Sequence, residues 1–192
     1  MIRRRLRCAV SWGVGLSVAL GVLAVSEDAR ALKPGFTWER ATLNGGPRLA
    51  TDDLNFGLGI NGGYTLNQGV YLGGLFNYFL GEKSESSFGP TRIEYDFDAW
   101  FLMFEGGYDF GLAPKLVVRP TFAMGIVRAH GEVCVINPAG SVCDSHSDSE
   151  FQAAASGQIL YDMGGLTIGG EMRLFFAEFE GIWFGFNIGG AF

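Results

Sequence analysis

Apolar and small residues alternate with period two in segment after segment of the chain, which is typical of β-strands with two different faces. In the clearest segment, 53–64, one face is apolar: Leu54, Phe56, Leu58, Ile60 and Tyr64. The other face carries Asn55, Gly57, Gly59, Asn61 and Gly63. A soluble sandwich would bury its apolar face and place charged residues on the other. Glycine and asparagine on the second face instead predict the interior of a narrow barrel.

The connections between these segments alternate in length. Short turn-like stretches lie at 65–69, 111–115 and 162–165, and longer polar stretches lie at about 44–52, 82–92 and 130–149, with a tighter connection at about 177–181. This alternation is typical of transmembrane barrels. It predicts an all-β fold, a closed antiparallel up-and-down transmembrane β-barrel of about eight strands. The expected strands are 35–43, 53–64, 70–81, 92–110, 116–129, 150–161, 166–176 and 182–192.

The first 31 residues have the pattern of an export signal. Arg3, Arg4, Arg5 and Arg7 precede an uncharged run, 9–25, and the small-x-small sequence Ala29-Arg30-Ala31 follows. We therefore expect a cleaved signal peptide at 1–31 and one barrel domain at 32–192. An uncleaved membrane anchor is the alternative, because the apolar run is only slightly shorter than a membrane span.

Composition narrows the chemistry of residues 32–192. They carry nine Lys and Arg against eighteen Asp and Glu, a formal charge of −9, which argues against nucleic-acid binding. Cys134 and Cys143 form an even pair separated by loop-type residues, which predicts a disulfide in an exported protein. A metal site would need further ligands, and only His130 and His146 are available, so neither a metal nor a cofactor is predicted.

The final strand carries the most specific motif. Phe184, Phe186 and Ile188 alternate with smaller residues, and the sequence ends at Phe192. Residues 183–192 resemble the C-terminal targeting strand of outer-membrane barrels, although Gly190 stands where that strand has a large apolar residue. Residues 32–192 as a whole resemble the small barrels of the outer-membrane protein A and X type. The resemblance implies an outer-membrane location, contact with membrane lipids, and recognition by the barrel assembly machinery through Phe184, Phe186, Ile188 and Phe192.

An eight-stranded barrel is narrow enough to be filled by its own side chains. Strand phase places Glu105, Arg119, Glu171 and Arg173 inside it, with a β-bulge expected near 99–101. Buried charges must be paired, so these four residues predict an interior ion network that stabilises a plugged lumen. Conduction of protons or ions through them is the alternative.

Few residues in the sequence could act in catalysis. His130 lies near Glu132, and His146 lies within the acidic run 144–148, but a serine adjacent to a histidine does not make a triad. That run could hold Ca²⁺, yet it lacks the twelve-residue loop pattern. We therefore predict a non-enzymatic structural or interaction barrel that displays outer loops, chiefly 130–149, to an unidentified extracellular ligand. The alternative functions are a small conduit and a lipid A-active enzyme, an activity found among small outer-membrane barrels.

Overall fold

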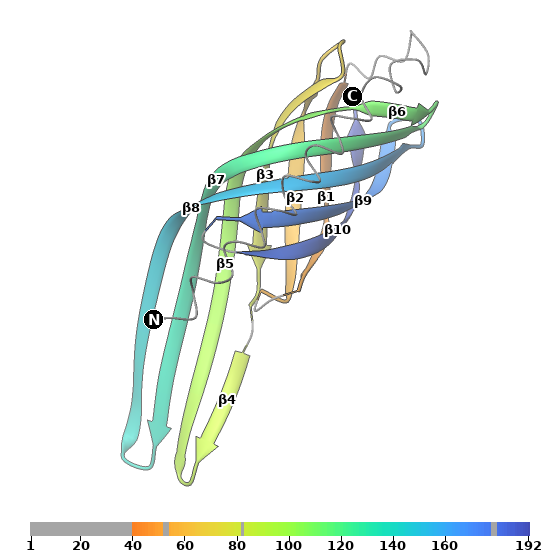
Figure 1. Cartoon of the computed structure of the whole chain (residues 1–192). Helices are drawn as coiled ribbons and strands as arrows, with labels where there is room; N and C mark the ends of the chain where they lie inside the picture. Colours follow the sequence, from red (N-terminus) through yellow and green to blue (C-terminus); the bar gives the residue numbers. More distant parts are fainter. Residues whose placement is uncertain (1–39, 52–53, 82, 178–179) are drawn as a thin grey trace.

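The computed structural model describes residues 40–51, 54–81, 83–177 and 180–192, which form antiparallel strands (Figure 1). None of these residues forms a helix long and apolar enough to cross a membrane. The predicted signal peptide at 1–31 lies outside the described residues. The strands are β1 Arg40–Ala50, β2 Phe56–Thr65, β3 Val70–Phe79, β4 Lys83–Phe88, β5 Thr91–Tyr108, β6 Phe110–Ala113, β7 Leu116–Asn137, β8 Gly140–Asp162, β9 Leu166–Phe176 and β10 Glu180–Ala191.

Eight of these strands close into a ring. Their order is β1-β2-β3-β5-β7-β8-β9-β10, and the ring closes where β1 pairs with β10. Thr42 on β1, for example, lies opposite Gly63 of β2 on one side and Ala191 of β10 on the other. The predicted closed up-and-down barrel is therefore confirmed. Of the two remaining strands, β4 pairs only with β5, and β6 pairs only with β7.

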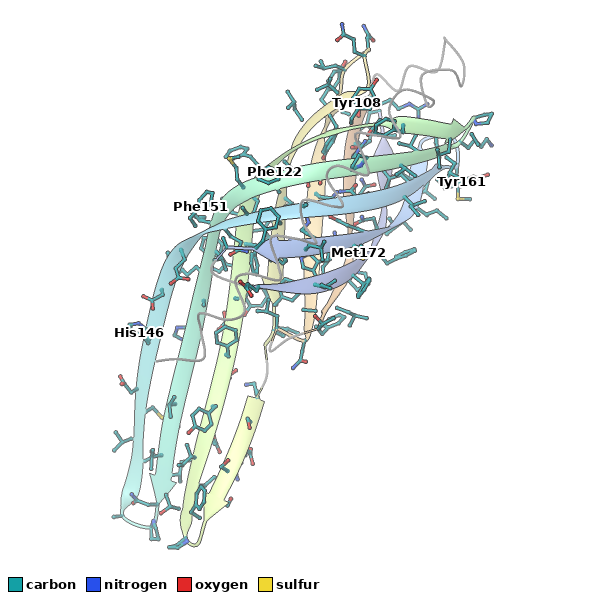
Figure 2. All side chains as sticks on the ribbon, in the orientation of Figure 1. Tyr108, Phe122, His146, Phe151, Tyr161 and Met172 are labelled. Atoms are coloured by element: carbon teal, nitrogen blue, oxygen red, sulfur yellow. A yellow bond between two sulfur atoms is a disulfide. The ribbon has the colours of Figure 1, made fainter. Side chains whose placement is uncertain are left out.

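The wall of the barrel has its apolar side chains outside. On β2, Leu58 and Ile60 are exposed, whereas the residues that follow each of them, Gly59 and Asn61, are buried. Phe122, Phe151 and Met172 project in the same way from other parts of the ribbon (Figure 2). This alternation is the one that the sequence predicts. It places Gly and Asn inside because the narrow interior has little room for large side chains.

The short turns lie together at one end of the ring, the end that also holds the C-terminus (Figure 1). Exposed tyrosines mark this end: Tyr64, Tyr108 and Tyr161 each lie within a few residues of a turn. The predicted turn at 111–115 is shorter than expected, because β6 occupies its first three residues and leaves only Pro114 and Lys115 as the turn.

At the opposite end, two connections predicted as loops are strands. Residues 83–92 and 130–149 contribute to an antiparallel sheet that projects beyond the ring (Figure 1). We call it the outer sheet: β4, with 91–98 of β5, 130–137 of β7 and 140–148 of β8. The β7–β8 pairing runs without a break from Leu116 opposite Tyr161 to Asn137 opposite Gly140. Polar sequence did not prevent strand formation here because ladder hydrogen bonds come from the backbone.

One edge of the outer sheet is open. On the side away from β7, β8 pairs with β9 only between Ala154 and Asp162. Residues 140–153 therefore have no strand neighbour on that side among the described residues.

The first strand is displaced from its predicted place at 35–43. Residues 35–39 lie outside the described range, and 44–50, predicted as a loop, belong to β1. Gly45-Gly46-Pro47 suggests a turn in sequence, but a Cβ on Gly46 would lie 2.0 Å from the Phe186 carbonyl oxygen. Close strand approach therefore explains this glycine. Pro47 has no N–H to donate to β10, and the Arg48 guanidinium instead donates to the Phe186 carbonyl oxygen at 3.0 Å.

The β-bulge predicted near 99–101 is wrong. The pairings of β5 with β3 and with β7 pass through Ala99 and Phe101 without a register shift. The inward positions of the barrel, such as Phe101 and Glu105, continue in phase to Phe97 and Tyr95 in the outer sheet. The apparent change of phase along β5 has another cause. Beyond the ring, β5 belongs to the outer sheet, and the two faces of this sheet carry other residue types than the two faces of the barrel wall.

Candidate functional site

The centre of the lumen contains a compact ion cluster. Arg173 of β9 lies 2.7 Å from a carboxylate oxygen of Glu105 on β5 and 2.5 Å from one of Glu171 on β9. A second guanidinium nitrogen, Nε, donates to Glu171 at 3.0 Å. All three side chains are buried. Three of the four predicted interior charges therefore lie together, and hydrogen bonding between charged groups offsets part of the cost of their burial.

Arg119, the fourth predicted residue, has a different partner. Its Nε and Nη2 donate to the two carboxylate oxygens of Asp109, at 2.5 and 2.9 Å. Its guanidinium also stacks on the Tyr71 ring, 3.8 Å from the centroid. The Tyr71 hydroxyl donates to Glu105 at 3.0 Å and so joins this pair to the central cluster. Sequence reasoning missed Asp109 and Tyr71, although Asp109 has the same strand parity as Glu105.

Arg48 is a further lumen residue that the sequence analysis missed, because it placed this position in a loop. Its Nη2 donates to the Asn187 side-chain oxygen at 2.8 Å. Its guanidinium lies 5.0 Å from the centroid of the Trp183 ring, and Arg173 lies 5.3 Å from the centroid of the same ring. With Arg48 included, three buried arginines balance three carboxylates, those of Glu105, Asp109 and Glu171.

Toward the outer sheet, the lumen becomes apolar. Phe101 is fully buried, and its ring lies 5.7 Å from that of Phe79 and 5.1 Å from that of Phe175, measured between centroids. Trp183 lies 6.3 Å from Phe175 and 6.5 Å from Phe79. We call these four residues the aromatic cap. The cap and the paired charges below it lie at successive levels of the barrel interior.

The outer sheet carries a disulfide and both histidines. Cys134 and Cys143 lie opposite each other on β7 and β8 and form the predicted bond. Their proximity to Glu132 does not create a thiolate metal site while the disulfide is intact, because both sulfurs are used. His130 Nδ1 lies 2.8 Å from the Ser147 hydroxyl, and His146 Nε2 lies 2.9 Å from a carboxylate oxygen of Asp148.

The two histidines do not converge on one site. Strand register places His130, Glu132 and Ser147 on one face of the outer sheet and His146 with Asp148 on the other. The residues that suggested catalysis in sequence are therefore divided between two solvent-exposed surfaces. On one surface the His130 imidazole contacts Ser147, and on the other the His146 imidazole contacts Asp148.

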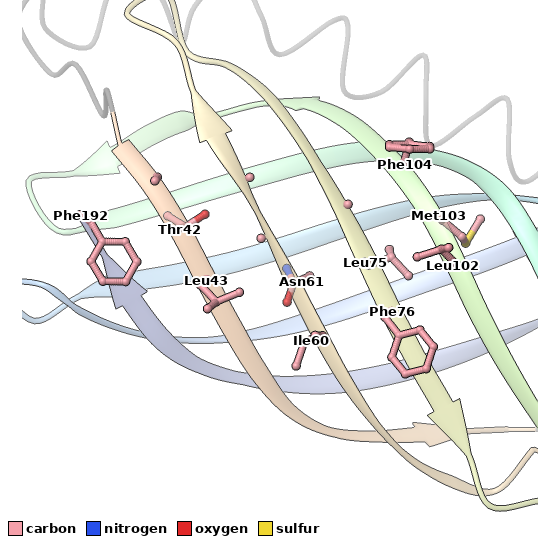
Figure 3. Close-up of a pocket in the computed structure, with 14 residues that line it drawn as sticks. Thr42, Leu43, Ile60, Asn61, Leu75, Phe76, Leu102, Met103, Phe104 and Phe192 are labelled. Atoms are coloured by element: carbon pink, nitrogen blue, oxygen red, sulfur yellow. The ribbon is translucent and has the colours of Figure 1, made fainter.

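A shallow hollow lies on the outer wall. Gly62 of β2 and Gly74 of β3 are paired in register, between Leu43 of β1 and Phe104 of β5. Because both glycines lack side chains, a hollow of about 520 Å³ forms on the wall, and Ile60, Phe76 and Phe192 line it (Figure 3). Its exposed lining is almost entirely apolar. Such a lining is suited to contact with apolar groups.

A closed ring of eight antiparallel strands, apolar outside and lined inside with glycine, polar and charged residues, is the fold of the small outer-membrane β-barrels. Among solved structures, the chain is similar to Ail, the attachment invasion locus protein of Yersinia pestis. The TM-score is 0.53 at 13% identity, covering 80% of this chain and 99% of Ail. It is also similar to the N-terminal β-barrel domain of OprF from Pseudomonas aeruginosa, with a TM-score of 0.50 at 15% identity, covering 82% of this chain and all of that domain.

A third similar structure is that of Ail in complex with the heparin analogue sucrose octasulfate. Its TM-score is 0.54 at 14% identity, covering 80% of this chain and 99% of that one. No protein-family model matches the chain, and no curated protein matches it in sequence. At these identities the likenesses establish the fold.

Proposed function

We propose that this protein is an outer-membrane barrel that holds the outer sheet above the membrane for recognition of an extracellular partner, and that it has no enzymatic activity. The observation that carries the proposal is the continuity of β5, β7 and β8, which pass from the barrel wall into the outer sheet without a register break. A recognition surface built from such strands is held rigidly.

Membrane lipids are the proposed surroundings of the barrel wall. An exposed apolar belt would be unfavourable in water but is favourable in hydrocarbon. Exposed tyrosines at the short-turn end, such as Tyr108 and Tyr161, fit the interface between membrane and water (Figure 2). This orientation places the short turns in the periplasm and the outer sheet outside the cell.

We propose a closed lumen rather than a conduit. The aromatic cap occupies the level next to the outer sheet, and the charged groups below it contact one another. A conduction path would have to pass between tightly packed aromatic rings and then separate paired charges.

The C-terminal strand supports a role in assembly. Phe184, Phe186 and Ile188 are exposed on the outer wall, as a partner that recognises this strand requires. The Phe192 ring lies next to the departure at Gly190: a Cβ at position 190 would lie 3.1 Å from it. We propose that Phe192 fills the space that a large side chain at position 190 would need, so that the barrel assembly machinery still meets a continuous apolar strand.

We do not propose sucrose octasulfate, the ligand in the Ail complex, as a ligand of this chain. Sucrose octasulfate is a polyanion, and residues 83–98 and 128–150 carry eight acidic and three basic residues. The resulting formal charge of −5 would repel a polyanion.

Function can be tested by combining conductance and display measurements. In planar bilayers, the protein is expected to give no single-channel current above background. On cells that produce it, β7–β8 residues should be open to external protease, and adhesion to a serum-protein coating should fall several-fold when residues 131–146 are replaced by a two-residue turn. Steady conductance, or unchanged adhesion by the trimmed variant, would contradict the proposal.

The disulfide is expected to stabilise the outer sheet and not the barrel. Cys134 and Cys143 lie beyond the ring, nine positions apart in the β7–β8 hairpin, so the chain entropy that the bond removes from the unfolded state belongs to the outer sheet and not to the barrel. The double variant C134S/C143S should keep the urea midpoint of barrel unfolding unchanged, while external protease cleaves near 138–139 several times faster. A lower barrel midpoint would instead assign the disulfide a role in barrel folding.

A further inference from the structure

The outer sheet has one apolar face. On this face, Tyr95 lies opposite Val133, and Ile93 lies opposite Val135, which lies opposite Val142 in turn. We call these five residues the apolar strip. The strip continues the inward-facing side of the barrel, because Phe97, next in phase on β5, packs against the buried core. The face therefore runs from the barrel interior out over the membrane surface.

The apolar strip is exposed. Tyr95 is 45% exposed, Val133 38% and Val142 72%. The other end of the same face carries Phe88 of β4, at 73%. These residues lie beyond the ring, away from the belt that hydrocarbon would cover (Figure 1). Apolar side chains clustered on an exposed surface mark an interaction site more often than single exposed ones do.

The opposite face of the outer sheet is charged, and its charges contact each other. Lys83 lies 2.6 Å from Asp96, and Asp96 raises the pKa of the Lys83 ammonium through a hydrogen bond and its charge. Arg92 lies 2.8 Å from Glu94 and also contacts Glu85. The basic side chains of the outer sheet are therefore paired with acidic groups on their own face.

Acidic groups on the apolar face have no such cation. Asp144 and Asp148 share this face with Val142, since they alternate with it along β8. Asp148 contacts only His146, and Asp144 has no basic partner among the described residues. Asp144 thus borders the apolar strip opposite Val133, and Asp148 lies farther toward the barrel, opposite Ala129 and in contact with His146.

We propose that the apolar strip is the docking surface for a basic amphipathic segment of a partner protein. Apolar side chains of that segment cover Tyr95, Val133 and Val142, and its Lys or Arg side chains pair with Asp144 and Asp148. A second copy of this chain is a poorer occupant, because it brings the same formal charge of −5 to the contact. The inference rests on the proposed function and names the class of partner.

The first test measures binding of three labelled synthetic peptides to the full-length protein in lipid nanodiscs by fluorescence anisotropy. One peptide alternates Val and Tyr with Lys at its borders, the second has Glu in place of Lys, and the third has Ser in place of Val and Tyr. We expect the basic amphipathic peptide to bind at least about tenfold more tightly than either of the others. Equal binding of all three, or no binding of the first, would overturn the proposal.

Matched variants separate the two faces. Y95S/V133S is expected to weaken binding of the basic amphipathic peptide by about tenfold or more. D144S/D148S should weaken it roughly threefold to tenfold, in keeping with two exposed ion pairs. E94S/E132S removes the same charge from the opposite face and should leave binding unchanged. Equal weakening by both charge variants would mean that only net charge matters, which contradicts a defined docking surface.

Two further measurements distinguish a loss of peptide binding from a loss of the barrel and from self-association. Heat-dependent gel migration shows whether each variant retains its barrel, and sedimentation shows whether Y95S/V133S abolishes self-association. If the wild-type protein dimerises through the apolar strip, a second copy is the occupant and the proposal is wrong. If no peptide binds but the variant trimmed at 131–146 still loses adhesion, the docking inference fails while the proposed function stands.

Discussion

Replacing Arg173 with methionine is expected to lower the free energy of unfolding by about 3–5 kcal/mol, because two buried carboxylates lose their cation. Glu105 and Glu171 each contact Arg173, and all three side chains are buried in the lumen. The loss can be measured by urea unfolding in lipid vesicles, with tryptophan fluorescence and gel migration as independent probes. Agreement of the two probes would establish that the whole barrel unfolds in one transition.

Two controls decide how the Arg173 result is interpreted. Arg128 of β7 is exposed on the outer face, and its replacement by methionine should change stability by no more than about 0.5 kcal/mol. The variant R48M/E105Q/E171Q/R173M removes two buried cations together with two buried carboxylates, so the lumen keeps its charge balance, and it should recover much of the loss. If R173M is as stable as the wild type, water reaches the lumen charges, and the proposal of a closed lumen is wrong.

Truncation of Phe101 to alanine is the second large effect expected, at about 3–5 kcal/mol. Phe101 is fully buried in the aromatic cap between Phe79 and Phe175, so its removal leaves a cavity that rigid barrel walls cannot close. The same urea titration measures the change, and bilayer recording tests whether the enlarged space admits ions.

Phe104 provides the matched control. It lies on the same strand, three positions away, but faces outward and is 79% exposed. F104A should cost only about 1.5–3 kcal/mol, the transfer term, because lipid fills the vacated space and no cavity remains. A loss from F104A as large as that from F101A would contradict a tightly packed cap.

The barrel could be predicted because its signal is local. Alternation along β2 and β10 places large apolar side chains on one face and Gly or Asn on the other, and period two follows directly from strand geometry. In the outer sheet, the similar signal in Ile93-Glu94-Tyr95-Asp96-Phe97 lies within the predicted strand 92–110, whereas 82–92 and 130–149 were predicted as loops. A strand with one polar face has a composition like that of a loop, and only knowledge of its partner strand identifies it as a strand.

The lumen contacts could be predicted only in part. Strand parity turns Glu105, Glu171 and Arg173 inward, and parity is a property of each strand alone. The partner of Arg119 depends on how far each strand is shifted against the next, which decides that Asp109 rather than Glu105 lies within reach. Arg48 was missed for another reason: Gly-Gly-Pro is typical of turns, and here it serves close strand approach.

The open edge of β8 affects how neighbouring molecules can associate. On the side away from β7, residues 140–150 have no strand neighbour among the described residues, and an exposed strand edge of this kind allows sheets to join edge to edge. This edge is also rich in side chains that resist joining, since Asp144, Asp148 and Glu150 would be brought against their own copies. Many molecules can therefore stand side by side at high density while each keeps its outer sheet separate and available.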